Sequence, residues 1–560
     1  MTKFNKINID CFNLIINELR MDKRSLRSCL LVNKEWCNIA VPILWKNHSW
    51  CNEDKPEKLF TAIFSCLPSS SKQILSDYNI KLPSTKSPLF NYVSFCEFPK
   101  PKIINKIIGI VLKGRYNREI LYDGETLDYG KTLYDNEKLD DREELDDKEE
   151  LDEKNILERE IYKLFVEQCK GVKELCWETS QPLPLFPGAL TCFSQLSSLD
   201  VDVDFVNSDV LYEMAQICRN LNRLTINNCS QDLPGLISLI DAQKNLKNVS
   251  LYPAHKKGTC KELSKALARK GSMINNLYLG PIGSISPSFL TSLINLKGIT
   301  IYEGDDIRKE IVDFQRYLAI SQFPDLQYIS IVGLSCFKEL AQLIEKTRGS
   351  ISEISLFTFN RFAENTGLFI KAIANNCPKI KSLPIYLRSE DFIHVKSLLL
   401  NCKYLEDIKF YGLASVITDD NIGDELLDIL TEFSPNLLTK ILLSGSWNYS
   451  INAFERFFES HREKRPLSIF EIRNISEENK VIVRKYIKEG VIIKSNIRSV
   501  LWELTIDEFN AQRTSDYLLL VWPVLILKHQ NNSLIFCNGS YDLGHDSHEY
   551  LALKQNSTRE

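Results

Sequence analysis

Histidine and cysteine, the side chains most often used for metal binding and nucleophilic catalysis, are present but are not arranged for either. Only two of the seven histidines, His545 and His548, lie close together, and their neighbours do not supply the spacing of a metal site. The sixteen cysteines include no pair separated by two to four residues, the spacing of zinc motifs. No nucleophile has an identifiable base partner, and neither glycine-rich phosphate-binding pattern occurs. We therefore expect no catalytic residue, no metal and no cofactor.

The bulk properties point in the same direction. The 560 residues are 44% hydrophobic and 25% charged, and a net charge of -4 gives no field that would attract nucleic acid or an anionic membrane. The first twenty residues lack the apolar core of a secretory signal. The longest apolar run, 517–527, has eleven residues, against about twenty for a membrane span. These features predict an intracellular protein, cytoplasmic and/or nuclear, with reduced thiols and with neither nucleic acid nor membrane as partner.

The main regularity is a repeated pattern, apolar-x-x-apolar-x-apolar. Twelve copies occur at intervals of 22 to 33 residues. The alternating end of each copy predicts a short strand with its apolar side chains facing inward, and the stretches between copies have helical periodicity. One such stretch, 207–221, has Leu211, Met214 and Cys218 at helical spacing after a start signal at Ser208 and Asp209. The first apolar residues of the copies are Val172, Leu196, Leu221, Leu246, Ile274, Leu296, Leu326, Ile351, Ile380, Leu405, Leu438 and Leu467.

A chain of such units resembles a leucine-rich-repeat solenoid. No single repeat can bury its apolar face, so neighbours stack into one continuous core. We expect an α/β fold over 159–494, with parallel strands on the concave face and helices on the convex face. Four cysteines each stand three residues before a strand motif, and we expect them to pack as small hydrophobic side chains: Cys169, Cys218, Cys377 and Cys402.

Three other segments differ from the repeats. Residues 49–122 predict a helical connector. The stretch 123–154 carries fifteen acidic and five basic residues, and its leucines recur every six positions, which makes no helical stripe and excludes a coiled coil. We interpret 123–158 as a solvated, acidic, low-complexity insertion, with partner binding as the less favoured alternative. The tail, 495–560, has no assignment.

The first 48 residues predict three short helices with more apolar positions than so small a unit can bury. Their pattern resembles an F-box. The shared features are an apolar opening at 7–9, spaced apolar positions at 14, 15 and 19, Leu26, the run CLLVNKEW at 29–36, and the closing pair at 44–45. The family usually has Leu-Pro where this chain has Ile9-Asp10, and Asp is a good helix N-cap.

An F-box followed by irregular repeats resembles the fungal-type F-box/LRR class of ubiquitin-ligase substrate receptors. The resemblance implies that the helices bind a Skp-type adaptor and, through it, a cullin–RING (SCF-type) ligase, while the solenoid holds a protein substrate. The alternative for the helices is a simple cap on the solenoid. The residues to which adaptor binding is assigned are Ile9, Leu14, Ile15, Leu19, Leu26, Cys29, Val32, Trp36, Leu44 and Trp45.

Aromatic residues occupy outward positions of several predicted strands. Aromatic side chains anchor interfaces, although they also favour strands for packing reasons alone. We expect this set to contact the substrate: Tyr252, Tyr278, Tyr302, Phe357, Tyr386 and Tyr411. The rival interpretation is a non-ligase LRR scaffold or inhibitor that binds a partner through the concave face, and a weaker one is an enzyme whose site lies in the tail.

Overall fold

The repeats form one twelve-stranded parallel sheet in which every strand pairs with its neighbours in the chain. The computed structural model describes residues 9–46, 56–82, 87–112 and 141–497, with gaps at 254–259, 284, 304–308, 359, 361–362, 414–421, 446, 463 and 474. The strands are β1 (Glu174–Trp177), β2 (Ser198–Asp202), β3 (Arg223–Cys229), β4 (Asn248–Pro253), β5 (Asn276–Leu279), β6 (Gly298–Tyr302), β7 (Tyr328–Val332), β8 (Glu353–Phe357), β9 (Ser382–Leu387), β10 (Asp407–Gly412), β11 (Lys440–Ser444) and β12 (Ile469–Ile472).

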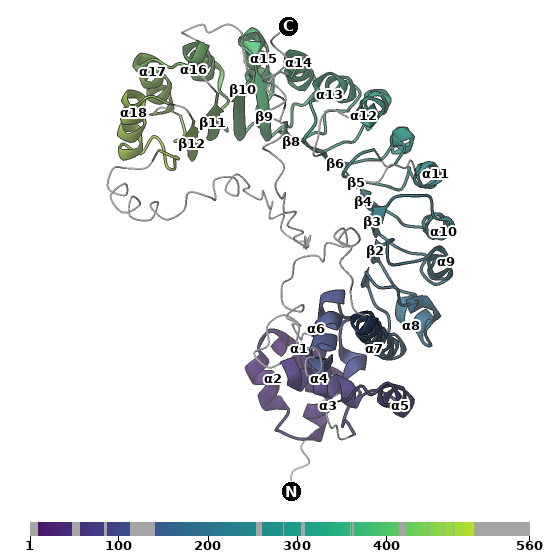
Figure 1. The fold of residues 1–560 in the computed structure, drawn as a ribbon. Helices are drawn as coiled ribbons and strands as arrows, with labels where there is room; N and C mark the ends of the chain where they lie inside the picture. The colour runs from purple at the N-terminus through teal and green to yellow at the C-terminus, as the bar shows by residue number, and fades with distance from the viewer. Residues whose placement is uncertain are drawn as a thin grey trace.

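Each strand coincides with one copy of the sequence motif, so the predicted α/β solenoid is confirmed. Equivalent motif positions pair directly: Leu199 lies opposite Leu224, and Val201 opposite Ile226. These inward side chains are fully buried, whereas the positions between them point out of the sheet. The sheet lines the inner side of a curved solenoid and the helices lie on the outer side (Figure 1).

The helices of the convex side bury an apolar stripe and end where each motif begins. In α9 the Asn207 side chain accepts a hydrogen bond from the Val210 backbone N–H at 3.0 Å, which caps the helix. The shortest repeat, between the motifs at Ile274 and Leu296, holds only the 3-10 helix η4 (Pro287–Ser292). The remaining elements are η3 (Leu183–Leu185), α8 (Ala189–Phe193), α9 (Ser208–Ile217), α10 (Pro234–Ala242), α11 (Lys261–Arg269), α12 (Lys309–Ile320), α13 (Phe337–Ile344), α14 (Thr366–Asn376), η5 (Ser389–Asp391), α15 (Phe392–Asn401), α16 (Ile422–Phe433), α17 (Ile451–Arg462) and α18 (Glu477–Lys488).

The N-terminal end of the solenoid is covered by α4 (Pro56–Ser65), α5 (Ser69–Asp77), η2 (Tyr92–Phe95), α6 (Pro101–Leu112) and α7 (Asp141–Gln168). Their buried side chains belong to the same continuous core as the repeats. The Phe98 ring lies 6.1 Å from that of Phe165 on α7 and 5.6 Å from that of Phe193 on α8. Residues 56–82, 87–112 and 157–168 therefore cap the solenoid by covering the apolar end of its first repeat.

The acidic segment continues into this cap. Helix α7 begins at Asp141, within the predicted insertion, and its residues from Leu157 onward contribute buried side chains to the core of the cap. Leu151 is exposed whereas Leu157, six residues on, is fully buried, as expected for leucines that form no stripe. Residues 113–140 lie outside the described part of the chain, as does the tail beyond 497.

Helices α1 (Ile9–Glu18), α2 (Lys23–Cys29) and α3 (Lys34–Lys46), with the short η1 (Leu19–Met21), form a separate unit. Its core is small and distinct from that of the solenoid: Ile16, Leu26, Cys29 and Ala40 are buried in it. In Figure 1 this unit lies with the cap helices at the N-terminal end of the arc. Within the described ranges, no helix is both long enough and apolar enough to cross a bilayer.

Candidate functional site

The three-helix unit folds around few side chains. The Phe12 and Trp36 rings pack with their centroids 4.7 Å apart, against the small core that contains Leu26. The Asp22 carboxylate begins α2 by accepting hydrogen bonds from the backbone N–H groups of Arg24 and Ser25, at 3.0 and 3.1 Å. A hydrogen bond from the Ser25 hydroxyl at 2.6 Å lowers the pKa of Asp22, and the two backbone hydrogen bonds lower it further.

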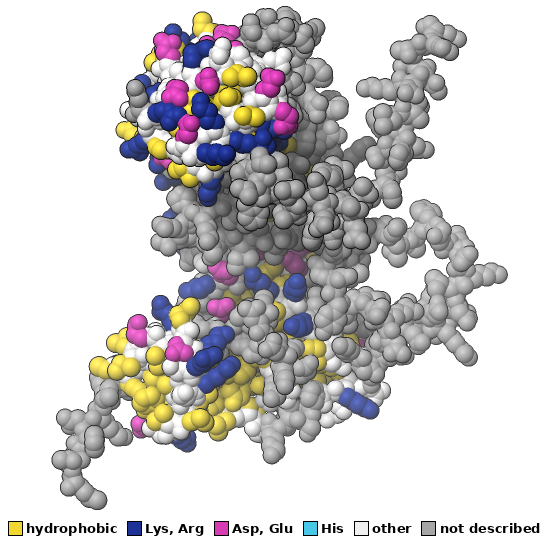
Figure 2. Space-filling model, turned by 90° about the vertical axis from the view of Figure 1, so that its left-hand side faces the viewer, with side chains coloured by type: hydrophobic (Ala, Val, Ile, Leu, Met, Phe, Trp, Pro, Cys, Tyr) yellow, Lys and Arg dark blue, Asp and Glu magenta, His cyan; other side chains and the backbone are white. Residues whose placement is uncertain are grey.

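Large apolar side chains remain exposed on this unit. Leu31 is 88% exposed, Met21 87% and Leu14 68%, and Ile15 and Val32 are more than half exposed. They come from α1, η1 and the turn after α2. Figure 2 shows hydrophobic side chains gathered on the lower body of the molecule, where Figure 1 places the N-terminal helices. Exposed apolar clusters of this kind mark interaction surfaces.

The structure divides the residues assigned to adaptor binding into three groups. Leu14, Ile15 and Val32 lie on the exposed apolar surface. Leu26 and Cys29 are buried inside the unit, so any contribution they make to binding acts through its shape. Four more are half-buried: Leu19, Trp36, Leu44 and Trp45. The side chain of the last, Ile9, lies outside the described residues.

Sequence reasoning missed Met21 and Leu31, which are the two most exposed apolar side chains among the described residues of the unit. Both fall off the helical stripes used to choose the others. An apolar residue in a turn, outside any stripe, is the signal that would have found them.

Trp45 connects the unit to the solenoid. Its ring packs against that of Tyr92 in η2, with centroids 4.7 Å apart, and contacts the continuous core of cap and repeats. Helix α3 runs to Lys46, directly after this contact. A helix anchored by a large aromatic contact gives the unit a defined orientation on the cap.

The second surface is the concave face of the sheet, where the six predicted aromatic residues all lie. Tyr302 is 39% exposed and Phe357 43%, while Tyr252, Tyr278 and Tyr411 are half-buried. The Tyr252 and Tyr278 rings are 4.8 Å apart, and those of Tyr386 and Tyr411 stack at 5.1 Å.

Tyr386 is more buried than the sequence suggested. Its hydroxyl oxygen accepts a hydrogen bond from the Thr358 backbone N–H at 3.1 Å, and its ring packs on Phe337. Burial raises the pKa of Tyr386 to about 12, so the hydroxyl stays neutral. Tyr386 therefore stabilises the concave face on which Tyr411 packs.

Gly280 allows the close approach of two strands on this face. A Cβ atom added there would lie 2.7 Å from both the Cβ and the carbonyl oxygen of Tyr302. The Tyr302 side chain therefore occupies space that any larger residue at 280 would take.

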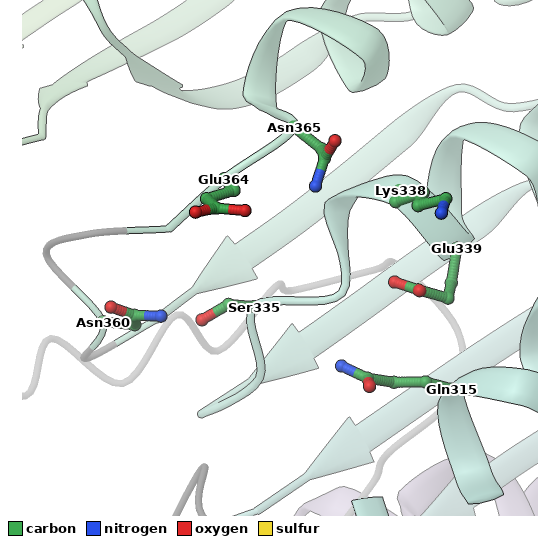
Figure 3. Close-up of a pocket in the computed structure, with 7 residues that line it drawn as sticks. All are labelled: Gln315, Ser335, Lys338, Glu339, Asn360, Glu364 and Asn365. Atoms are coloured by element: carbon green, nitrogen blue, oxygen red, sulfur yellow. The ribbon is translucent and has the colours of Figure 1, made fainter. Parts of the chain in front are cut away.

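A polar pocket of about 330 Å³ opens beside the C-terminal ends of β7 and β8 (Figure 3). Its lining mixes one cation with two carboxylates and four uncharged polar groups, without the apolar walls typical of small-molecule sites. Among the described residues no group of three or more histidine, cysteine and acidic side chains is placed to hold a metal ion. The pocket residues are Gln315, Ser335, Lys338, Glu339, Asn360, Glu364 and Asn365.

The four cysteines that precede strand motifs are buried, as predicted. Three of their thiols point at backbone carbonyls of a preceding element: Cys402 at Cys377 at 3.6 Å, Cys218 at Leu196 at 3.9 Å, and Cys169 at Val93 at 3.5 Å. Burial raises the pKa of Cys169, Cys218 and Cys402 to about 12, and these thiols stay protonated.

Twelve parallel strands in register, most of them followed by a helix on the convex side, define a leucine-rich-repeat solenoid. No protein-family model matches the chain, and no curated protein does. Among solved structures it is similar to the leucine-rich repeat-containing protein LegL7 from Legionella pneumophila, with 14% identity, a TM-score of 0.28, and coverage of 48% of this chain and 94% of that chain. A second similar structure is a Bacteroides fragilis protein, with 15% identity, a TM-score of 0.26, and coverage of 48% of this chain and 73% of that chain.

Proposed function

We propose that this chain is the substrate-recognition subunit of a cullin–RING (SCF-type) ubiquitin ligase, acting in the cytoplasm and/or nucleus. Its first three helices bind a Skp-type adaptor, and its solenoid binds a protein substrate. The observation that carries the proposal is the exposed apolar surface of the three-helix unit, centred on Leu14, Leu31 and Val32.

Two features favour an adaptor interface over a simple cap. The cap position is already filled by α4 to α7, whose side chains share the solenoid core. The three-helix unit has its own core, and five of its aliphatic side chains outside that core are more than half exposed. Apolar surface exposed in this way gains free energy when a partner covers it.

In this mechanism the chain performs no covalent chemistry. The adaptor connects it to the ligase, and a ubiquitin-conjugating enzyme bound there modifies lysines of the substrate. The contribution of this chain is proximity, because holding both partners converts an encounter between them into a local reaction. The packing of Trp45 on Tyr92 supports this role by setting the angle between the two binding surfaces.

The test is the affinity of the full chain for a purified Skp-type adaptor. In the variant Leu31→Asp/Val32→Asp, charge replaces apolar side chains worth about 1.5–3 kcal/mol each when buried, so we expect at least about a hundred-fold weaker binding. The matched control is Ile393→Asp/Leu400→Asp, two exposed apolar residues of α15, which should bind as the wild type does. Equal affinities for both double variants, or no binding by the wild type, would refute the proposal.

The second candidate is a non-ligase scaffold or inhibitor that binds a partner through the concave face alone. The exposed Tyr302 and Phe357 favour it equally well, because they require no adaptor. The same measurement separates the two functions: a scaffold binds its partner and ignores the adaptor. An enzyme site in the tail falls beyond the described residues.

A further inference from the structure

Strand register shows that large and small side chains alternate along part of one row of the concave face. At the outermost paired position, Asp202, Asn227 and Tyr252 lie side by side on β2, β3 and β4. Further along the solenoid, Tyr302, Val332 and Phe357 lie side by side on β6, β7 and β8, and Gly280 stands between Tyr252 and Tyr302. In this outermost row, from β4 to β8, the aromatic side chains therefore occupy alternate strands, and Gly280 and Val332 separate them. The row ends there, because β9 and β10 carry Tyr386 and Tyr411 side by side.

This alternation fixes the distance between successive aromatic side chains along the row. Neighbouring strands are about 4.8 Å apart, so side chains on alternate strands recur about every 9.6 Å. A polyproline II helix repeats every three residues, over about 9.3 Å, and presents one face at that interval. An extended β-type peptide repeats on one face about every 6.8 Å, which does not match.

The residues between the anchors suit such a ligand. The outward positions of β4 to β9 carry a single charged residue, Glu353, and otherwise aromatic, hydroxyl, amide and other uncharged groups. Tyrosine-lined surfaces of this kind hold proline-rich segments, whose preformed conformation costs little entropy to bind.

The N-terminal end of the same face is acidic. Glu178 follows β1, and Asp200 and Asp202 lie on β2, with no cation at the outward positions of either strand. Amide groups hold both aspartates in place: Asn227 donates to Asp200 at 2.7 Å, and Asn228 donates to Asp202 at 2.8 Å.

One strand, β3, separates this acidic end from the first aromatic position, Tyr252. Burial, the neighbouring Tyr278 and the Asp200 charge raise the pKa of Tyr252. Burial raises the pKa of Asp200, and the positive charge of Lys100, from the cap, acts on it in the opposite direction.

We infer that the concave face binds a polyproline II segment of a partner protein, with an arginine or lysine at the end that meets Glu178, Asp200 and Asp202 and with prolines at every third residue over Tyr252, Tyr302 and Phe357. This inference rests on the proposed function in assigning the concave face to a protein partner. It specifies the motif that such a partner carries.

The probe is a fluorescein-labelled peptide, Arg-Ala-Ala-Pro-Ala-Ala-Pro-Ala-Ala-Pro, titrated with the full chain in a fluorescence-polarisation assay. We expect saturable binding, at least tenfold weakening when arginine is replaced by glutamate, and a similar loss when the prolines are moved to every second residue. In the protein, Tyr302→Ala/Phe357→Ala should weaken binding at least tenfold. Asp200→Asn/Asp202→Asn should remove the preference for arginine and keep that for proline spacing.

Three results would overturn the inference: no binding at millimolar protein, equal affinity for both proline spacings, or equal affinity for the arginine and glutamate peptides. Circular dichroism melts of each variant verify that the solenoid stays folded. The Leu31→Asp/Val32→Asp variant should bind the peptide normally. Adaptor binding without peptide binding would support the ligase proposal and reject the polyproline II motif. Peptide binding without adaptor binding would support the motif and reject the ligase proposal.

Discussion

Gln243 offers a sharp test of how the repeats are held together. Its side chain is 1% exposed and connects two repeats. The amide oxygen accepts a hydrogen bond from the Leu221 backbone N–H at 2.9 Å, and the amide nitrogen donates to the Cys218 and Leu239 carbonyls, both at 2.8 Å. Replacement by leucine keeps the volume and removes all three bonds. At about 1 kcal/mol net for each bond, the free energy of unfolding should fall by about 3 kcal/mol.

The loss should be local, because each repeat contacts only its neighbours. Urea unfolding followed by circular dichroism measures the free energy, and hydrogen exchange with mass spectrometry locates the change in peptides covering 218–246. The control is Gln216→Leu, an exposed residue on α9, where we expect a change within about 0.5 kcal/mol. If the two variants unfold at the same urea concentration, the hydrogen bonds of Gln243 do not hold these repeats together.

Three further predictions concern single positions. Gly235→Ala should destabilise the protein by about 3 kcal/mol in the same urea titration, because the added Cβ would lie 1.8 Å from the Ser208 carbonyl oxygen. This loss is expected although alanine favours helices. The control is Gly490→Ala, which has open space around it and a φ of +78° and should cost only about 1 kcal/mol. Burial lowers the pKa of His461, so the unfolded chain binds its proton more readily, and the C-terminal repeats should lose stability as pH falls below about 6.5; a His461→Asn variant that shows an equal loss would contradict this. Burial raises the pKa of Asp200 to about 6, so the affinity for the arginine peptide should increase as pH rises from 5 to 7, and Asp200→Asn should flatten the profile.

The solenoid could be predicted from the sequence because its signal is local and repeated. Each strand depends on two apolar residues at fixed spacing, as at Leu224 and Ile226, and twelve copies leave little ambiguity. Small errors lie at the boundaries: the residue that caps α9 is Asn207, one position before the predicted start signal at Ser208.

The surfaces could be predicted less well because they depend on contacts between distant residues. Trp45 resembles an interface residue in sequence, yet its ring packs on Tyr92, 47 positions later, and no local pattern indicates that pairing. The six aromatic residues can be predicted as a set, but the alternation of three of them along β4 to β8 requires strand register, which places Gly280 next to Tyr302. The sequence pattern groups Tyr386 with the other five aromatic residues, because a hydrogen bond from Thr358 cannot be predicted from sequence.

The 3-10 helix η4 has a consequence for the shape of the ligand. A 3-10 helix is narrower than an α-helix, so the repeat that contains it is thinner on the outer side of the arc. Curvature in a solenoid comes from outer elements that are wider than the inner strands, and a thin repeat bends the sheet less. This repeat contributes β5, which lies between Tyr252 and Tyr302. A stiff, straight polyproline II segment should contact the concave face best where the sheet curves least, which is at this repeat.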